Sequence, residues 1–277
     1  NGLTVAVLEN HASQVVSLYI FVKNTGSIYD GALLGSGMSH LMEHVVAGSG
    51  TATRPEEAIE RTIQEIGAES NAYTTDDHTA YHLTLPALHY RKGLELLADF
   101  VLHSTFAEDK VKREQQVIVQ EQRMGEDDPG RALGKLFNEQ LYRVHPARVP
   151  VIGYPDIFLS LTREQILGFY RDRFTPDNFL VVLAGDVKTE EALAQVRELF
   201  EKAPRRSGAL PLLPEEPPIA SRRYGEKRMD LKYDQALLGF QTISLYHPDL
   251  YALDLFAGLL GDGQSSPLWQ ELKEKRQ

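Results

Sequence analysis

The segment His40-Leu41-Met42-Glu43-His44 constrains the fold more strongly than any other stretch of this 277-residue chain. It lies within residues 37–46, whose apolar spacing predicts a helix. Positions i, i+3 and i+4 project from one face of a helix, so His40, Glu43 and His44 would lie together there. Two imidazoles one turn apart can chelate a metal ion. Taken alone, the pattern is equally compatible with a solvated helix face.

A catalytic zinc ion usually takes three protein ligands, so a third ligand is needed. The chain contains no cysteine, which excludes thiolate ligands, disulfides and a cysteine nucleophile. The best candidates are Glu114 and Glu121, in a helix predicted from Ala107 to Gly125. They are about two turns apart and therefore share one face of that helix. One could bind the metal while the other braces the site, although a Glu-rich helix face is more often only solvated.

Composition restricts the class of partner. The apolar fraction of 42% and the charged fraction of 25% are typical of a soluble globular protein. The formal net charge of −10 argues against nucleic acid or an anionic membrane surface, because both attract clustered Lys and Arg. The longest apolar runs, such as 179–185, are far shorter than the roughly 20 residues of a membrane-spanning helix. Because Asn1 directly precedes a β-rich run, we expect a leader to have been removed, and the localisation stays unknown.

The first three quarters of the chain mix strand-like and helix-like segments. Leu3–Glu9 and Val15–Val22 are β-rich and predict an antiparallel pair, and Glu69–Asp76 with Thr79–Leu85 predict another. Asn178–Ala184 is typical of a buried strand. Helical patterns cover 55–67, 90–102, 107–125, 130–143, 162–174 and 189–202. We therefore predict an α+β domain over residues 1–204, with a mainly antiparallel sheet covered by helices.

The composition changes after this domain. Residues 205–223 are rich in proline and end in basic residues, which predicts an interdomain linker. Beyond it, Arg228–Lys232 and Gln235–Leu245 have strand-like patterns, and a helix is predicted from about Asp249 to Leu260. Strands followed by a helix also occur near the start of the chain, but this second occurrence lacks the His-x-x-Glu-His pattern. Residues 224–277 are thus predicted to be a partial second domain of the same type.

Several motifs together resemble one family. His-x-x-Glu-His is the inverted form of the zinc-protease helix motif. With the segments REQQVIVQEQ (113–122) and NAYT (71–74), it resembles the pitrilysin and insulinase type of metallopeptidase, including the processing-peptidase branch. The interval from His44 to Glu121 is the one this family would place there. The resemblance covers most of residues 1–203, and LLGDGQSSPLWQELKEKRQ (259–277) resembles the start of the family's second homologous domain.

The resemblance implies a role for each site residue. His40, His44 and Glu121 would bind one Zn²⁺ per chain. Glu43 would be the general base that takes a proton from the metal-activated water. Glu114 would be a further catalytic carboxylate, which orients a ligand or shares the proton load. The implied function is that of a zinc-dependent metalloendopeptidase acting on extended or unfolded peptides.

The resemblance also implies how a substrate binds. Asn71, Ala72 and Tyr73 would lie on an edge strand to which a peptide adds as a further strand. The family uses an Arg and a Tyr of its second domain near the substrate carbonyl; Lys273 matches the Arg position, and the Tyr would follow Gln277. Because two halves enclose the substrate in this family, we expect a homo- or heterodimer or a further C-terminal half.

Three other readings were open at this level. A non-catalytic peptide-binding subunit of a two-chain protease is the main alternative, but such a subunit has no need of the ligands or of Glu43. A lyase such as the S-ribosylhomocysteine enzyme shares His-x-x-Glu-His, but its chemistry relies on cysteine. A second metal at His78 and His82 is disfavoured, because histidines on sheet strands are more often packed or hydrogen-bonded.

Overall fold

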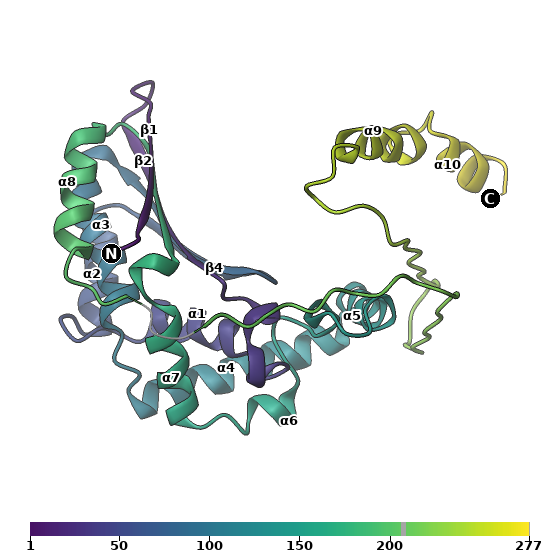
Figure 1. Cartoon of the computed structure of the whole chain (residues 1–277), viewed down its shortest axis with the longest axis horizontal. Helices are drawn as coiled ribbons and strands as arrows, with labels where there is room; N and C mark the ends of the chain where they lie inside the picture. Colours follow the sequence, from purple (N-terminus) through teal and green to yellow (C-terminus); the bar gives the residue numbers. More distant parts are fainter. Residues whose placement is uncertain (206–208, 277) are drawn as a thin grey trace. The chain divides into compact units, whose positions relative to one another are not determined.

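The computed structural model describes residues 1–205 and 209–276, and Figure 1 shows the order of their elements. The chain divides into two units. The first consists of Asn1–Pro217 with Arg223–Leu237, and the second of Pro218–Arg222 with Leu238–Gln277. The candidate site residues on α1, α4 and β3 all belong to the first unit.

A five-stranded sheet forms the centre of the first unit, in the order β1-β5-β2-β4-β3. Its strands are β1 (Thr4–Glu9), β2 (Val15–Lys23), β3 (Glu69–Thr74), β4 (His78–Pro86) and β5 (Phe179–Gly185). β1 runs parallel to β5, and the other three neighbouring pairs are antiparallel. The prediction of a mainly antiparallel α+β fold is confirmed.

The predicted pairing of the first two strands is wrong. β5 lies between β1 and β2 and pairs with both. The residues of β5 that face the helices, Phe179, Val181 and Leu183, are fully buried. β1 alternates between exposed and half-buried residues, and its Leu8 is exposed. The more apolar strand therefore takes the inner position, and the chain order of the strands does not give their order in the sheet.

Helices cover one face of this sheet, as α3 and α8 show in Figure 1. The side chains of β2 that point to them, Val16, Leu18, Ile20 and Val22, are completely buried. The helices of the first unit are α1 (Met38–Gly48), α2 (Glu56–Glu65), α3 (Tyr90–His103), α4 (Glu108–Asp127), α5 (Pro129–Leu141), α6 (Pro155–Phe158), α7 (Arg163–Arg173) and α8 (Thr189–Phe200). Short 3₁₀ helices occupy Ser27–Tyr29, Gly31–Leu33, Ala87–His89, Pro146–Arg148 and Pro176–Asn178.

The predicted helices of the first unit are all present, with ends shifted by only a few residues. Their side-chain periodicity is a local property, which explains why the sequence was sufficient. The single turn α6 was not predicted, because four residues are too few to show a period. None of the helices in the described ranges has the length and apolar character that crossing a bilayer requires.

Part of the segment predicted as a linker packs on the end of α5; its residues 206–208 lie outside the described residues. The carboxylate of Glu216 accepts the backbone N–H groups of residues 143, 144 and 145 at 2.7–2.9 Å. The Arg223 guanidinium donates to the carbonyl oxygens of Gln140 and Leu141. The bonds from Arg223 satisfy two of the carbonyl groups that the C-terminal end of a helix leaves free, and Glu216 satisfies N–H groups of the segment that follows α5.

The second unit contains α9 (Leu250–Gly261), α10 (Pro267–Trp269) and a π-helical turn (Gln270–Glu274). The helix predicted near 249–260 is therefore confirmed. The strands predicted at Arg228–Lys232 and Gln235–Leu245 are wrong, because these described residues form no ladder. Strand-like alternation needs a neighbouring strand to satisfy the backbone, and the described residues supply none for these segments.

Candidate metal centre

The His-x-x-Glu-His motif lies on α1, whose start is fixed by close backbone packing. Gly37 precedes the helix with φ of +64°, and a Cβ there would lie 2.4 Å from the carbonyl oxygen of Ile152. Only glycine tolerates both conditions without strain. The side chains of Met38, Leu41, Met42 and Val45 are buried in the core. The amphipathic pattern thus leaves His40, Glu43 and His44 on the half-buried face of α1.

α4 brings Glu121 to this face of α1. Oε2 of Glu121 lies 3.8 Å from Nε2 of His40 and 3.6 Å from Nε2 of His44. Ligand atoms of these three residues all lie within 4.8 Å of one another. The distances are too long for good hydrogen bonds. They are close to the roughly 3.4 Å that separates ligand atoms around tetrahedral zinc with bonds of about 2.1 Å.

The donor set therefore fits a zinc ion. Burial, followed by the nearby His44, lowers the pKa of His40 to about 4. His40 is neutral at pH 7 and keeps the lone pair that a metal ligand requires. The side chain of Glu121 is 38% exposed, against 16% for each histidine, so the cluster opens to solvent on the side of α4. Such an opening leaves space for a fourth, non-protein ligand.

Glu114 contacts Nδ1 of His44, the ring nitrogen that is not turned toward Glu121. It is buried, and its Oε2 lies 3.3 Å from Nδ1 of His44. With Nε2 turned toward Glu121, Nδ1 is the nitrogen that donates, and this bond sets the orientation of the ring. Arg113 holds Glu114 in turn: its Nε donates to Oε1 of Glu114 at 2.9 Å, and its Nη2 donates to the Gly48 carbonyl at 2.7 Å. No sequence pattern singles out Arg113, because two of its partners, Gly48 on α1 and Glu56 on α2, are distant in the chain.

Glu43 lies beside the cluster and contacts the edge of the sheet. Its Oε2 accepts a hydrogen bond of 2.6 Å from Oγ1 of Thr74 on β3. Burial raises the pKa of Glu43 above its ordinary value, while the hydrogen bond from Thr74 and the charge of His44 partly oppose this. A carboxyl with a raised pKa is better matched to proton transfer near neutral pH. Thr74 belongs to the NAYT segment, but the sequence did not indicate this contact.

The other residues of NAYT lie on β3, which ends the strand order of the sheet. In the ladder with β4, Ala72 is opposite Tyr81, whose hydroxyl donates to Met42 O of α1, so Ala72 faces the helices. Asn71 and Tyr73 point to the opposite face and are exposed. The roles of these three residues in substrate binding stay predictions. His78 and His82 pack against Tyr73 and join no cluster of three ligand residues in the described part of the chain.

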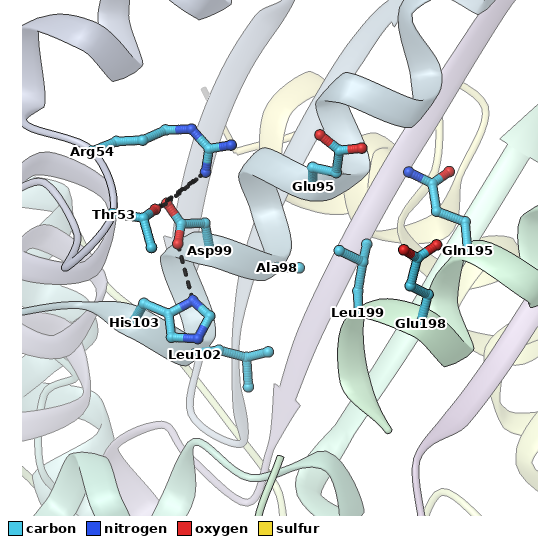
Figure 2. A pocket seen from close by; sticks show the side chains of 10 residues that line it. All are labelled: Thr53, Arg54, Glu95, Ala98, Asp99, Leu102, His103, Gln195, Glu198 and Leu199. Atoms are coloured by element: carbon cyan, nitrogen blue, oxygen red, sulfur yellow. Dashed lines mark hydrogen bonds and ion pairs between the residues drawn. The ribbon is translucent and has the colours of Figure 1, made fainter. Parts of the chain in front are cut away.

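A pocket of about 380 Å³ lies apart from these residues, between α3 and α8 (Figure 2). The buried carboxylate of Asp99 lies at its wall and accepts hydrogen bonds from Thr53, Arg54 and His103. None of the residues predicted for the metal site lines this pocket. The Asp99 network ties the segment that follows α1 to α3.

The fold and the cluster define a class of protein: an α+β domain in which one helix carries an inverted zinc motif and a second helix supplies a carboxylate. The chain belongs to the insulinase family of peptidases. The profile described as insulinase (peptidase family M16) matches residues 4–154, and that described as the peptidase M16 inactive domain matches residues 160–277. The predicted family is confirmed.

Individual relatives agree with this family. A protein of Mycobacterium leprae described as an uncharacterized zinc protease is 32% identical and matches 99% of this chain and 62% of its own length. A Bacillus subtilis protein, also described as an uncharacterized zinc protease, is 26% identical and matches 100% of this chain and 66% of its own length. The crystal structure of a Helicobacter pylori protease has a TM-score of 0.84 at 26% identity, with 99% of this chain and 67% of that chain covered. The chain thus spans about 62–66% of the length of these two curated relatives.

Proposed function

We propose that this chain carries the zinc site of a metalloendopeptidase that hydrolyses extended or unfolded peptides. The observation that carries the proposal is the convergence of His40, His44 and Glu121 at the spacing of zinc ligands, with Glu43 on the same helix face. The names of the relatives, which are described as zinc proteases, support it. One zinc ion per chain would be held by these three side chains.

Each residue contributes a separate part of the reaction. When bound, zinc supplies Lewis-acid polarisation of the scissile carbonyl and lowers the pKa of water from about 15.7 to about 7. Glu43 accepts the proton of the attacking water and returns it to the leaving amine. Glu114 holds the His44 ring in place through Nδ1. Asn71, Ala72 and Tyr73 bind the peptide through the outer edge of β3, which recognises extended backbone before side chains.

We also propose that residues 224–277 belong to a second domain of the same type, joined through the linker at 205–223. The second family profile matches residues 160–277, a range that includes residues 224–277 but begins within the first predicted domain. The substrate would be enclosed between two such halves, from one chain or from a partner chain. The Lys273 ammonium lies 3.9 Å from the centroid of the Trp269 ring, and its place in catalysis rests on the family resemblance.

Zinc analysis and a peptide assay on the full-length protein test the proposal. We expect about one zinc per chain after dialysis and cleavage of a quenched peptide. Glu43→Gln should retain the zinc and lose activity by roughly 10²- to 10⁴-fold, the usual contribution of a general base. Glu126→Gln, which changes an exposed carboxylate on α4, is the matched control and should leave both unchanged.

The alternative of a non-catalytic peptide-binding subunit predicts a different result. Bound zinc together with no hydrolysis of any denatured substrate by the full-length protein would favour that role. A protein that retains no zinc after dialysis would contradict both the metal site and the proposed enzyme.

A further inference from the structure

Thr74 contacts Glu43 more closely than any other described hydrogen-bonding group does. The 2.6 Å separation of Thr74 Oγ1 and Glu43 Oε2 is in the range of a hydrogen bond to an ionised carboxylate. The two residues are 31 positions apart in the sequence and lie on β3 and α1. Within the described residues, no other hydrogen bond reaches this carboxylate. One oxygen of Glu43 is therefore fixed, and the other stays free to take a proton.

A free glutamate side chain is a poor general base because it is mobile. Fixing its three side-chain torsions costs roughly 1–2 kcal/mol of conformational entropy. A base must also lie within about 2.6–3.2 Å of the proton it removes. The hydrogen bond from Thr74 restricts these torsions before substrate binds, so part of this entropy is already lost in the free protein.

The Thr74 hydroxyl is itself held by the sheet. Thr74 lies opposite Thr79 in the ladder of β3 and β4, and their hydroxyl oxygens are 3.4 Å apart. Oγ1 of Thr25 lies 3.1 Å from Oγ1 of Thr79, and Thr25 and Thr79 are both fully buried. Because the single hydroxyl proton of Thr74 is donated to Glu43, Thr74 can only accept from Thr79, and at 3.4 Å that contact is weak. The Thr25 hydroxyl donates to the carbonyl oxygen of Val22 at 2.6 Å. Thr74 is therefore held mainly by its place in the ladder of β3 and β4.

We propose that Thr74 is a positioning residue that fixes the general base to the substrate-binding strand. The inference rests on the proposed function of Glu43 and β3. The Thr74 side chain points to α1, on the same face of β3 as Ala72, whereas a peptide would add along the outer edge of the strand through backbone groups. Loss of the hydroxyl should therefore impair the chemical step and leave peptide binding and zinc binding intact.

Two substitutions separate the hydroxyl from the shape of the side chain. Thr74→Val keeps the β-branched shape that suits a strand and removes the donor, whereas Thr74→Ser keeps the donor. In the zinc-loaded full-length protein, we expect Thr74→Val to lower kcat by roughly 10- to 100-fold, the effect of displacing a reacting group by about 1 Å. KM and zinc content should not change. Thr74→Ser should keep most of kcat. Thr84→Val is the matched control, because it removes a hydroxyl on β4 that is hydrogen-bonded to Ser17 on β2.

A second measurement does not depend on activity. The unfolding midpoint is measured for the metal-free wild type, for Thr74→Val, for Glu43→Ala and for the double variant, which together form a double-mutant cycle. We expect Thr74→Val to lower the midpoint in the wild-type background and to have little effect once Glu43 is Ala.

The outcomes distinguish this inference from the proposed function. An active enzyme in which Thr74→Val leaves kcat unchanged, or in which Thr74→Ser is as impaired as Thr74→Val, overturns the role of Thr74 alone. Equal midpoint shifts in both backgrounds also overturn it. A full-length protein that binds zinc but never cleaves peptide overturns the proposed function and this inference together, even where the cycle shows that the hydrogen bond exists.

Discussion

Removal of the Glu114 carboxylate should weaken zinc binding without abolishing it. Glu114 is not one of the three clustered ligand residues, but its Oε2 accepts the hydrogen bond from Nδ1 of His44. In Glu114→Ala this nitrogen loses its partner, and the ring that carries the proposed ligand atom is free to rotate. Arg113 still binds Glu56 at 3.0 Å and the carbonyl oxygen of Gly48, so the contact between α1 and α4 is retained.

The size of the effect follows from the geometry of the bond. Loss of a partner behind a metal-binding histidine usually lowers metal affinity by about 10- to 100-fold. The His44–Glu114 distance of 3.3 Å is just beyond the usual range of hydrogen bonds. We therefore expect the lower limit, a loss of about tenfold or 1.4 kcal/mol, for Glu114→Ala. Glu114→Gln keeps a neutral acceptor and should lower the zinc affinity by roughly threefold.

Competition with a chelator of known zinc affinity, at constant pH near 7, measures these constants. Glu121→Ala removes a proposed ligand and should lose far more affinity, whereas Glu126→Ala on the exposed side of α4 should match the wild type. Two results would refute the reasoning. Glu114→Ala could bind zinc as tightly as the wild type, or it could lose as much affinity as Glu121→Ala, which would make Glu114 a ligand.

Two further predictions concern stability. The pKa of His40, held at about 4 by burial, lies below the value of about 6.5 in an unfolded chain, so the unfolded state binds more protons between these values. The free energy of unfolding of the metal-free protein should therefore fall by up to about 3 kcal/mol as the pH falls from 6.5 to 4. Urea unfolding at several pH values should show this fall, and His40→Gln should make it smaller. Asp99 accepts hydrogen bonds from Thr51 and Arg54 at 2.6 and 2.7 Å. Asp99→Ala should cost about 3 kcal/mol in urea unfolding, and a loss below about 1 kcal/mol would mean that the network contributes little.

Only part of the site could be predicted from local physics. The placement of His40, Glu43 and His44 on one face follows from the geometry of a helix, and no tertiary contact is needed to infer it. The choice between Glu114 and Glu121 could not be made in this way, because both lie on one face of α4. The family resemblance assigned them, and the structure places Glu121 between the two rings and Glu114 behind one of them.

The sequence by itself determined the helices of the first unit except the single turn α6, the strands of its sheet, and the placement of the motif residues on one helix face, because side-chain periodicity is a local property. The pairing of β3 with β4 was predicted, but only the tertiary structure decided that β5 is inserted between β1 and β2. It also decided that Thr74 reaches Glu43 and that Arg113 on α4 bonds to the Gly48 carbonyl at the end of α1. These contacts join segments that are distant in the chain, so they depend on which surfaces pack together, and no pattern within one segment encodes that.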